Sequence, residues 1–289
     1  MRIRKWYVDC TAEDGTVLIG YAGTLGRGPF NIPIQSVVLY PSSGDPPDAR
    51  WRMVAAPPSL EPGGGVRWHA QELRIEGAWE PRAEPVSRIL LATPELRVDW
   101  RCHLPRGWAR IGLWDRTLEG WGYVEEMIIE GDLRRFPIRE LHWGRFLGEA
   151  DYTVWLDWKG PHPQSVLVVN GAEARGMVSR EAVTLDDGRT IPLAAGDPPT
   201  SPSSSLDPNP APGAAESASR VDPDPAVRVL ADRRVGDAFF PPLPPLRWVV
   251  PRVLLGLRER KLSGRGRLRR DRGGEASEGW LLYETVEFP

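Results

Sequence analysis

The sequence predicts an all-β protein, because short segments of alternating polar and apolar residues recur along it and no long segment has a helical period. Turn-forming residues separate these segments at intervals that suit a β-barrel or sandwich rather than strand–helix–strand units. The 289 residues include 13 Trp, which favours aromatic-lined cavities or stacking surfaces, although some of these rings will only pack thin β-layers.

Strands are expected along most of the chain, each bounded by residues such as Gly, Pro, Asn, Asp and Ser. In the first part they cover residues 5–10, 16–25, 33–40, 51–55, 66–79, 87–93, 96–104 and 108–114, followed by the aromatic-rich stretch 118–160. In the second part they cover 165–170, 182–192, 227–230, 248–257, 264–270 and 279–288.

A long segment at 196–225, rich in Pro, Ser, Ala and Asp, interrupts this pattern and cannot build a core, so we expect it to be disordered. A weak internal repeat lies on both sides of it: the pattern E-G-W-x-x-x-E occurs at 119–125 and again at 278–284. The sequence therefore predicts two related β-domains, residues 1–160 and a shorter 161–289 that contains the linker.

Composition excludes several classes of function. A net charge of -2 gives no overall attraction to nucleic acid or to acidic membranes. The start of the chain has no apolar signal region and no run approaches a membrane span, so we expect a cytoplasmic protein without a transmembrane segment. Cys10 and Cys102 are then expected to be free thiols, with a disulfide between them left open.

No motif for a phosphate loop, dinucleotide or metal is present, and the four His lack metal-ligand spacing, so neither a cofactor nor a metal is expected. A basic run at 258–272 holds eight basic and two acidic residues. It contains no aromatic residue that could stack on bases, so a solvated hairpin is favoured over nucleic-acid binding.

The stretch 118–160 contains two strand faces that are apolar apart from one charge each. Trp121, Tyr123, Glu125, Met127 and Ile129 share the first face, on which Glu125 is the only charge. On the second face, formed by positions 141, 143, 145 and 147, Arg145 is the only charge. A buried charge needs a partner or a task, so we expect Glu125 and Arg145 to lie in contact.

Three short motifs resemble the carotenoid 1,2-hydratase/AttH-like superfamily of tandem lipocalin-like domains, to which tocopherol cyclase-like proteins and some natural-product cyclases are similar. They are Trp6-Tyr7, the GWGYVE segment at 120–125, and Trp143-Gly144-Arg145 followed by the aromatic strand 152–158. The resemblance implies two calycin-type barrels side by side and an apolar ligand cavity. In catalytic members it implies acid-promoted addition or cyclisation on a polyene without a redox cofactor.

The chain departs from the hydratase branch, which carries a denser run of Asp, His and Asn after Gly-Tyr. Here only Glu125 and Glu126 supply acids at that place. Apolar surroundings favour the protonated form of a carboxyl, and aromatic faces stabilise a carbocation, whereas a neighbouring Arg would keep the carboxyl ionised. His142, on the face opposite Trp143, is expected to be exposed and is a weaker candidate for a base.

Two hypotheses follow for an apolar cavity in a β-barrel. The first is a cofactor-independent cyclase, hydratase or isomerase for a hydrophobic terpenoid or polyketide, and the second is a non-catalytic carrier of an apolar small molecule. The candidate catalytic residues are Glu125, Tyr123 and Arg145, and the candidate substrate-binding residues are Trp121, Met127, Trp143, Tyr152 and Trp155.

Overall fold

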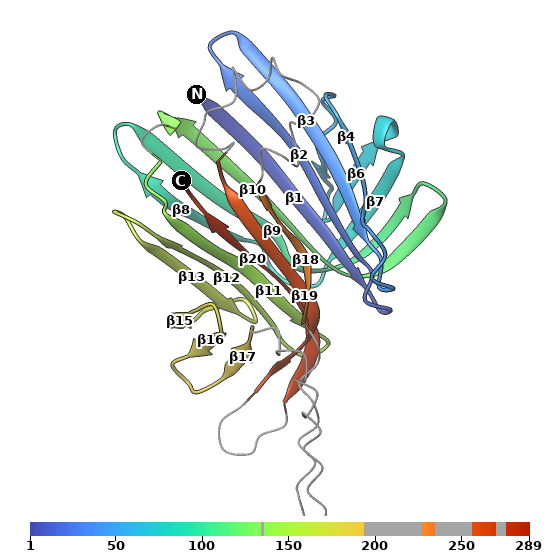
Figure 1. Ribbon diagram of the computed structural model, residues 1–289, viewed down its shortest axis with the longest axis vertical. Helices are drawn as coiled ribbons and strands as arrows, with labels where there is room; N and C mark the ends of the chain where they lie inside the picture. Colours follow the sequence, from blue (N-terminus) through green and yellow to red (C-terminus); the bar gives the residue numbers. More distant parts are fainter. Residues whose placement is uncertain (134–135, 194–226, 235–255, 270–275) are drawn as a thin grey trace, which may run out of the picture.

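A computed structural model describes residues 1–133, 136–193, 227–234, 256–269 and 276–289, and within them almost every element is a β-strand (Figure 1). The linker predicted at 196–225 lies outside the described residues, as does most of the strand predicted at 248–257. The all-β prediction is confirmed, and η1 (Gln71–Leu73), a single 3-10 turn, is the one helical element in the described part of the chain.

The first sheet contains ten antiparallel strands from residues 2–131. Its order is β4-β3-β2-β1-β10-β9-β7-β6-β5, with β8 paired to β9. The strands are β1 (Arg2–Ala12), β2 (Val17–Arg27), β3 (Phe30–Tyr40), β4 (Asp48–Arg52), β5 (Ser59–Leu60), β6 (Val66–Ala70), β7 (Ile75–Pro81), β8 (Val86–Ala92), β9 (Leu96–Leu113) and β10 (Arg116–Gly131).

The second sheet has the order β14-β13-β12-β11-β20-β19-β18, and a small sheet β15-β16-β17 lies beside it. Its strands are β11 (Glu140–Gly148), β12 (Tyr152–Lys159), β13 (Gln164–Val169), β14 (Ala172–Glu173), β18 (Val227–Arg234), β19 (Arg258–Leu268) and β20 (Ser277–Glu287). The small sheet consists of β15 (Gly176–Val178), β16 (Ala182–Leu185) and β17 (Thr190–Pro192).

The break between the two large sheets falls between β10 and β11, earlier than the domain boundary predicted at residue 160. β11 pairs with β12 on one side and with β20 on the other, so residues 140–159 lie in the second sheet. The partner strand β20 follows more than a hundred residues later, and local alternation contains no information about such a distant pairing.

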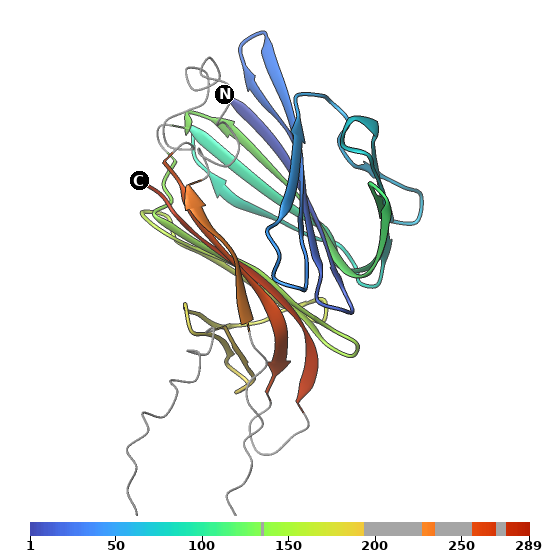
Figure 2. The same cartoon turned by 45° about the vertical axis from the view of Figure 1, so that its right-hand side comes forward.

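The buried apolar side chains form three clusters, one inside the curled first sheet, one between the two large sheets and one between the second and the small sheet. The first sheet curls around a core that includes Trp68 and Trp79, and its outer face packs against the second sheet (Figure 2). The other face of the second sheet packs against the small sheet through Trp155 and its neighbours. Cys10 and Cys102 are free and buried, the first inside the first sheet and the second between the sheets.

The two copies of the repeated motif occupy corresponding central strands. β10 lies between β1 and β9, and β20 lies between β11 and β19. Each motif Trp is covered by an Arg: the Arg106 Cζ is 4.5 Å from the Trp121 ring centroid, and the Arg265 Cζ is 4.0 Å from that of Trp280. The repeat therefore reflects a shared local packing arrangement at the same place in both sheets.

Two glycines of the recognised motifs are explained by ring packing. A Cβ on Gly122 would lie 2.6 Å from Cδ1 of Trp79, and one on Gly144 would lie 2.3 Å from Cζ2 of Trp155. Both contacts are shorter than side chains tolerate, so these positions need glycine because a large ring crosses the strand there.

No helix in the described ranges is long and apolar enough to cross a membrane.

Candidate functional site

A cavity of about 310 Å³ lies between the two large sheets and is lined mainly by apolar and aromatic side chains. One wall comes from β1, β2 and β10 and the other from β11, β12, β19 and β20. The predicted ligand cavity lies inside a β-barrel, whereas the cavity that Glu125 lines lies between two sheets. Its lining includes Tyr7, Tyr21, Glu125, Met127, Trp143, Glu259 and Glu284.

Glu125 is the polar centre of this cavity. It is 2% exposed, and its Oε2 accepts hydrogen bonds from Trp100 Nε1 at 2.6 Å, Tyr123 OH at 2.7 Å and Trp143 Nε1 at 3.1 Å. All three donors are neutral, and no ion pair of Glu125 is found within the described residues. No hydrogen bond to its second oxygen, Oε1, is found in the parts of the chain that the structure describes.

The predicted contact between Glu125 and Arg145 is wrong, because Arg145 pairs with Asp9. Both side chains are 0% exposed; Arg145 Nε donates to Asp9 Oδ2 at 2.9 Å and Nη2 donates to Oδ1 at 2.6 Å. Burial disfavours the Arg145 cation, but the carboxylate of Asp9 outweighs this effect and raises the pKa of Arg145. Arg145 is therefore a structural cation that ties the two sheets together.

Asp9 was missed although the same reasoning could have found it. Tyr7 and Asp9 alternate with Trp6 and Val8, so Asp9 is the only acid on its strand face, which also carries Lys5. Three such charges, on Asp9, Glu125 and Arg145, permit more than one pairing, and only the packing of the sheets selects between them.

The second copy of the motif carries a carboxylate in a different environment. Glu284 lies 2.8 Å from Lys261 Nζ, which also donates to Glu259 Oε2 at 2.7 Å. Burial disfavours the Lys261 cation, yet the charge of Glu284 outweighs it and the pKa of Lys261 is raised well above its usual value. Cys102 takes the place of Lys261 opposite Glu125. Only the first copy therefore keeps an acid without a neighbouring cation.

Aromatic rings surround Glu125. Trp143 makes edge contacts with Tyr7 and Tyr123, at centroid distances of 4.8 and 5.3 Å, and Tyr7 contacts Tyr21 at 5.4 Å. Burial, and then the charge of Asp9, raise the pKa of Tyr7 well above its ordinary value, so Tyr7 is a neutral phenol at physiological pH. Tyr7 lines the cavity and was not among the predicted site residues.

The structure brings only some of the candidate residues together. Met127 and Trp143 line the cavity with Glu125. Tyr123 is outside the cavity lining and donates a hydrogen bond to Glu125. Trp121 is partly exposed under Arg106, and Tyr152 is buried between the sheets but away from the cavity wall.

Trp155, the last of the candidates, lies on the other face of the second sheet. It packs against the small sheet and so faces away from the cavity.

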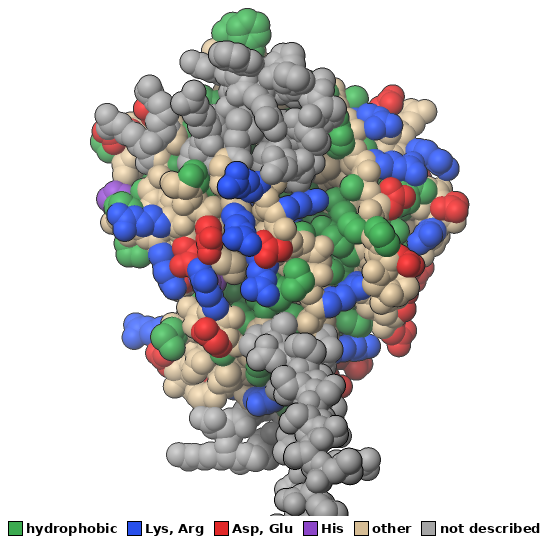
Figure 3. Space-filling view, in the orientation of Figure 1, with side chains coloured by type: hydrophobic (Ala, Val, Ile, Leu, Met, Phe, Trp, Pro, Cys, Tyr) green, Lys and Arg blue, Asp and Glu red, His purple; other side chains and the backbone are tan. Residues whose placement is uncertain are grey.

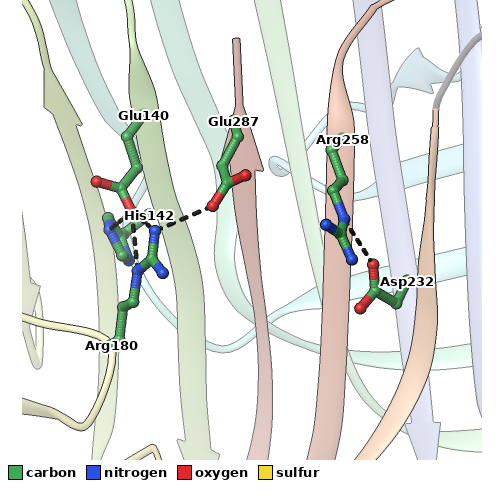
Figure 4. A network of polar contacts seen from close by, with 6 residues as sticks. All are labelled: Glu140, His142, Arg180, Asp232, Arg258 and Glu287. Carbon is green, nitrogen blue, oxygen red and sulfur yellow. Dashed lines mark hydrogen bonds and ion pairs between the residues drawn. The ribbon is translucent and has the colours of Figure 1, made fainter. Parts of the chain in front are cut away.

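His142 lies opposite Trp143, as predicted, but it is 3% exposed rather than exposed. Its Nε2 is 3.1 Å from Glu140 Oε1, beside Arg180, which bridges Glu140 and Glu287 (Figure 4). Burial is the main reason that the pKa of His142 is lowered. This network holds the turn between β15 and β16 against the second sheet and is remote from Glu125.

The basic run forms β19 in its described part, and four of its cations, Arg258, Lys261, Arg265 and Arg267, have acidic or aromatic partners. Arg258 pairs with Asp232 at 3.0 Å (Figure 4). Arg267 lies 3.1 Å from Glu278. On the face seen in Figure 3, basic and acidic side chains lie next to one another and do not gather into one basic patch.

In the described segments no cluster of three His, Cys, Asp or Glu side chains is arranged to hold a metal ion.

Sequence comparison finds no matching family model and no significant match among curated proteins. Among solved structures, an AttH-like protein from Nitrosomonas europaea superposes with a TM-score of 0.52 at 9% identity, covering 98% of this chain and 92% of that one. CghA with Sch210972 gives 0.51 at 9% identity, covering 99% and 88%. Kievitone hydratase from Nectria haematococca gives 0.49 at 8% identity, covering 99% and 88%. The resemblance inferred from the sequence is confirmed at the level of the fold, which this chain shares with the AttH-like protein and CghA.

Proposed function

We propose that the chain is a cofactor-independent enzyme of the cyclase, hydratase or isomerase type, acting on a hydrophobic terpenoid or polyketide in the cavity between the sheets. The observation that carries the proposal is the environment of Glu125. Its Oε2 is fixed by three neutral donors, while no cation neutralises it among the described residues. A carboxyl held in this way at an aromatic cavity is suited to general acid–base chemistry.

Because all three donors bind Oε2, the two oxygens of Glu125 have different roles in this proposal. When the carboxyl is protonated, Oε2 is the accepting oxygen and Oε1 carries the proton. Transfer of that proton from Oε1 to an alkene, epoxide or carbonyl oxygen leaves Glu125 ionised and the substrate cationic. The same carboxylate then takes a proton back after ring closure, double-bond migration or addition of water.

The aromatic wall supplies the second requirement of such a reaction. The rings of Tyr7 and Trp143 lie next to Glu125, and their faces attract a developing carbocation. Tyr123 does not line the cavity and acts through Glu125, so it is a positioning residue. The fold neighbour CghA was crystallised with Sch210972, so this fold can hold a bound compound.

A carrier for an apolar small molecule is the second candidate. The observation in its favour is that three hydrogen bonds also satisfy a buried carboxyl that has only a structural role. The two functions share the cavity and differ in whether the bound molecule changes.

The test uses a panel of polyene terpenoids and linear polyketides, with products analysed by liquid chromatography and mass spectrometry. Wild type should convert at least one compound to a product of equal mass or one heavier by one water. Glu125→Gln keeps the hydrogen bonds to Trp100, Tyr123 and Trp143 but places an amide where Oε1 was, so turnover should fall by about 10²–10⁴-fold with little change in ligand affinity.

The neighbouring Glu126 provides a matched control, because it is 1% exposed and lies on the opposite face of the same strand. Glu126→Gln should keep turnover within a few-fold of wild type. Equal loss of turnover in both variants would contradict the role of Glu125. Tight Nile red binding without conversion of any compound would favour the carrier.

A further inference from the structure

A second and larger cavity, of about 560 Å³, opens at the end of the first sheet that carries the β2–β3 turn, at the top of Figure 1. Its walls come from β1, β2, β3 and the segment 54–57 that follows β4. Trp6 and Ala22, in its wall, belong to the core that the first sheet encloses. The cavity is thus the mouth of the first sheet's own interior, and Glu125 does not line it.

Two buried donors in this wall have no partner. Gln35 is 2% exposed and Trp6 is 3% exposed, and neither Gln35 Nε2 nor Trp6 Nε1 finds a hydrogen-bond acceptor in the described parts of the chain. The pairing register places Trp6 and Gln35 on either side of Ala22, so the side chains of both donors lie on the same face of the sheet. Because unpaired buried donors are unfavourable, two in one cavity wall indicate an acceptor supplied from outside the chain.

The guanidinium group of Arg4 lies close to Trp6 in the same cavity wall. Arg4 lines the cavity, its Nε donates to Glu126 Oε1, and its Cζ lies 5.9 Å from the Trp6 ring centroid. Glu126 also lies 3.4 Å from Arg101, so one carboxylate faces two guanidinium groups. No acidic residue is present among the described residues that line the cavity.

The remaining wall is apolar. Ala22, Val54, Ala55, Ala56 and Pro57 contribute to it, and Phe30, at 71% exposure, lies at its rim. A cavity with an apolar wall, two neutral donors and a cation is complementary to a molecule with a hydrocarbon body and one anionic acceptor group.

We propose that the mouth of the first sheet is a binding site for an amphipathic carboxylate. It adjoins the Glu125 cavity, with which it shares Arg4, Ala22, Gly23 and Thr24, but Trp6, Gln35 and residues 54–57 line only this site. The carboxylate accepts hydrogen bonds from Gln35 Nε2, Trp6 Nε1 and the Arg4 guanidinium, and the hydrocarbon body lies against residues 54–57. The site is independent of whether the cavity between the sheets is catalytic.

The test is isothermal titration of the full chain with decanoate, decanol and acetate near pH 7.5. Decanoate should bind with one-to-one stoichiometry, decanol at least about tenfold more weakly because it lacks the charge, and acetate not detectably. Gln35→Leu should weaken decanoate about tenfold and raise the thermal midpoint of the free protein, because an unpaired donor is removed. Val54→Trp, which fills the mouth from an exposed position, should abolish decanoate binding.

A control variant separates the two cavities. Leu156 lines only the cavity between the sheets, so Leu156→Trp should leave decanoate binding unchanged while displacing Nile red. The proposal is overturned if decanol binds as tightly as decanoate, if decanoate does not bind, or if Leu156→Trp removes binding that Gln35→Leu and Val54→Trp retain.

Discussion

Replacing Asp9 by Asn tests the ion pair that joins the two sheets. The substitution keeps the size of the side chain and removes the charge opposite Arg145, whose side chain is 0% exposed. Arg145 Nη2 would still donate to Thr11 Oγ1, at 3.0 Å, but a hydroxyl group cannot neutralise the guanidinium charge. Removing one member of such a buried pair costs about 3–5 kcal/mol of unfolding free energy.

Urea denaturation followed by tryptophan fluorescence measures this loss. The chain offers a control pair with the same two distances: Arg189 donates twice to Oδ2 of Asp187, at 2.9 and 2.6 Å, but Asp187 is 53% exposed. Asp187→Asn should therefore change the unfolding free energy by less than about 1 kcal/mol.

A double variant separates the lost charge from other effects of the substitution. Asp9→Leu combined with Arg145→Met removes both charges from the dry interface and should recover most of the stability that Asp9→Asn loses. If Asp9→Asn cost no more than Asp187→Asn, or if the double variant were as unstable as Asp9→Asn, the account of this pair would be wrong.

Two further substitutions test local packing and charge. Gly144→Ala places a Cβ 2.3 Å from Trp155 Cζ2 and should cost about 1–3 kcal/mol in urea denaturation, whereas Gly112→Ala, whose nearest contact would be 3.7 Å, should cost less than half as much. Burial opposes ionisation of Glu126, but the hydrogen bonds from His103 and Arg4 outweigh it and lower its pKa. This stabilisation is present above the unfolded value of about 4.3 and is lost as pH falls through the folded pKa, so Glu126→Gln should flatten the decline of the thermal midpoint below pH 5.

The strands could be predicted because their signal is local. Alternation along residues 66–70 or 96–104 reports which side chains face a core, whatever the partner strand is. Pairing is not local: β11 was assigned to the first domain because nothing near it in sequence indicates β20, which supplies its other edge.

The candidate site could be predicted only in part, for the same reason. Glu125 was found as the single charge on its strand face, but its donor Trp100 comes from β9 and its predicted partner Arg145 faces Asp9. Lys261 was counted with a solvated basic run, whereas it is buried between Glu259 of its own strand and Glu284 of β20. The contact between Asp9 and Arg145 joins strands that are distant in sequence. It depends on how the two sheets pack, which the pattern of a short segment cannot predict.

The pair between Asp9 and Arg145 also determines which surfaces of this chain can associate. The register sets Asp9 opposite Tyr123 and Arg145 opposite Leu282, so the acid and the base stand at corresponding positions of the two sheets. Two copies of the first sheet brought face to face in the same way would bury Asp against Asp, and two copies of the second would bury Arg against Arg. Each of these two faces therefore accepts its unlike counterpart, whereas association of two chains through the same face would bury two like charges.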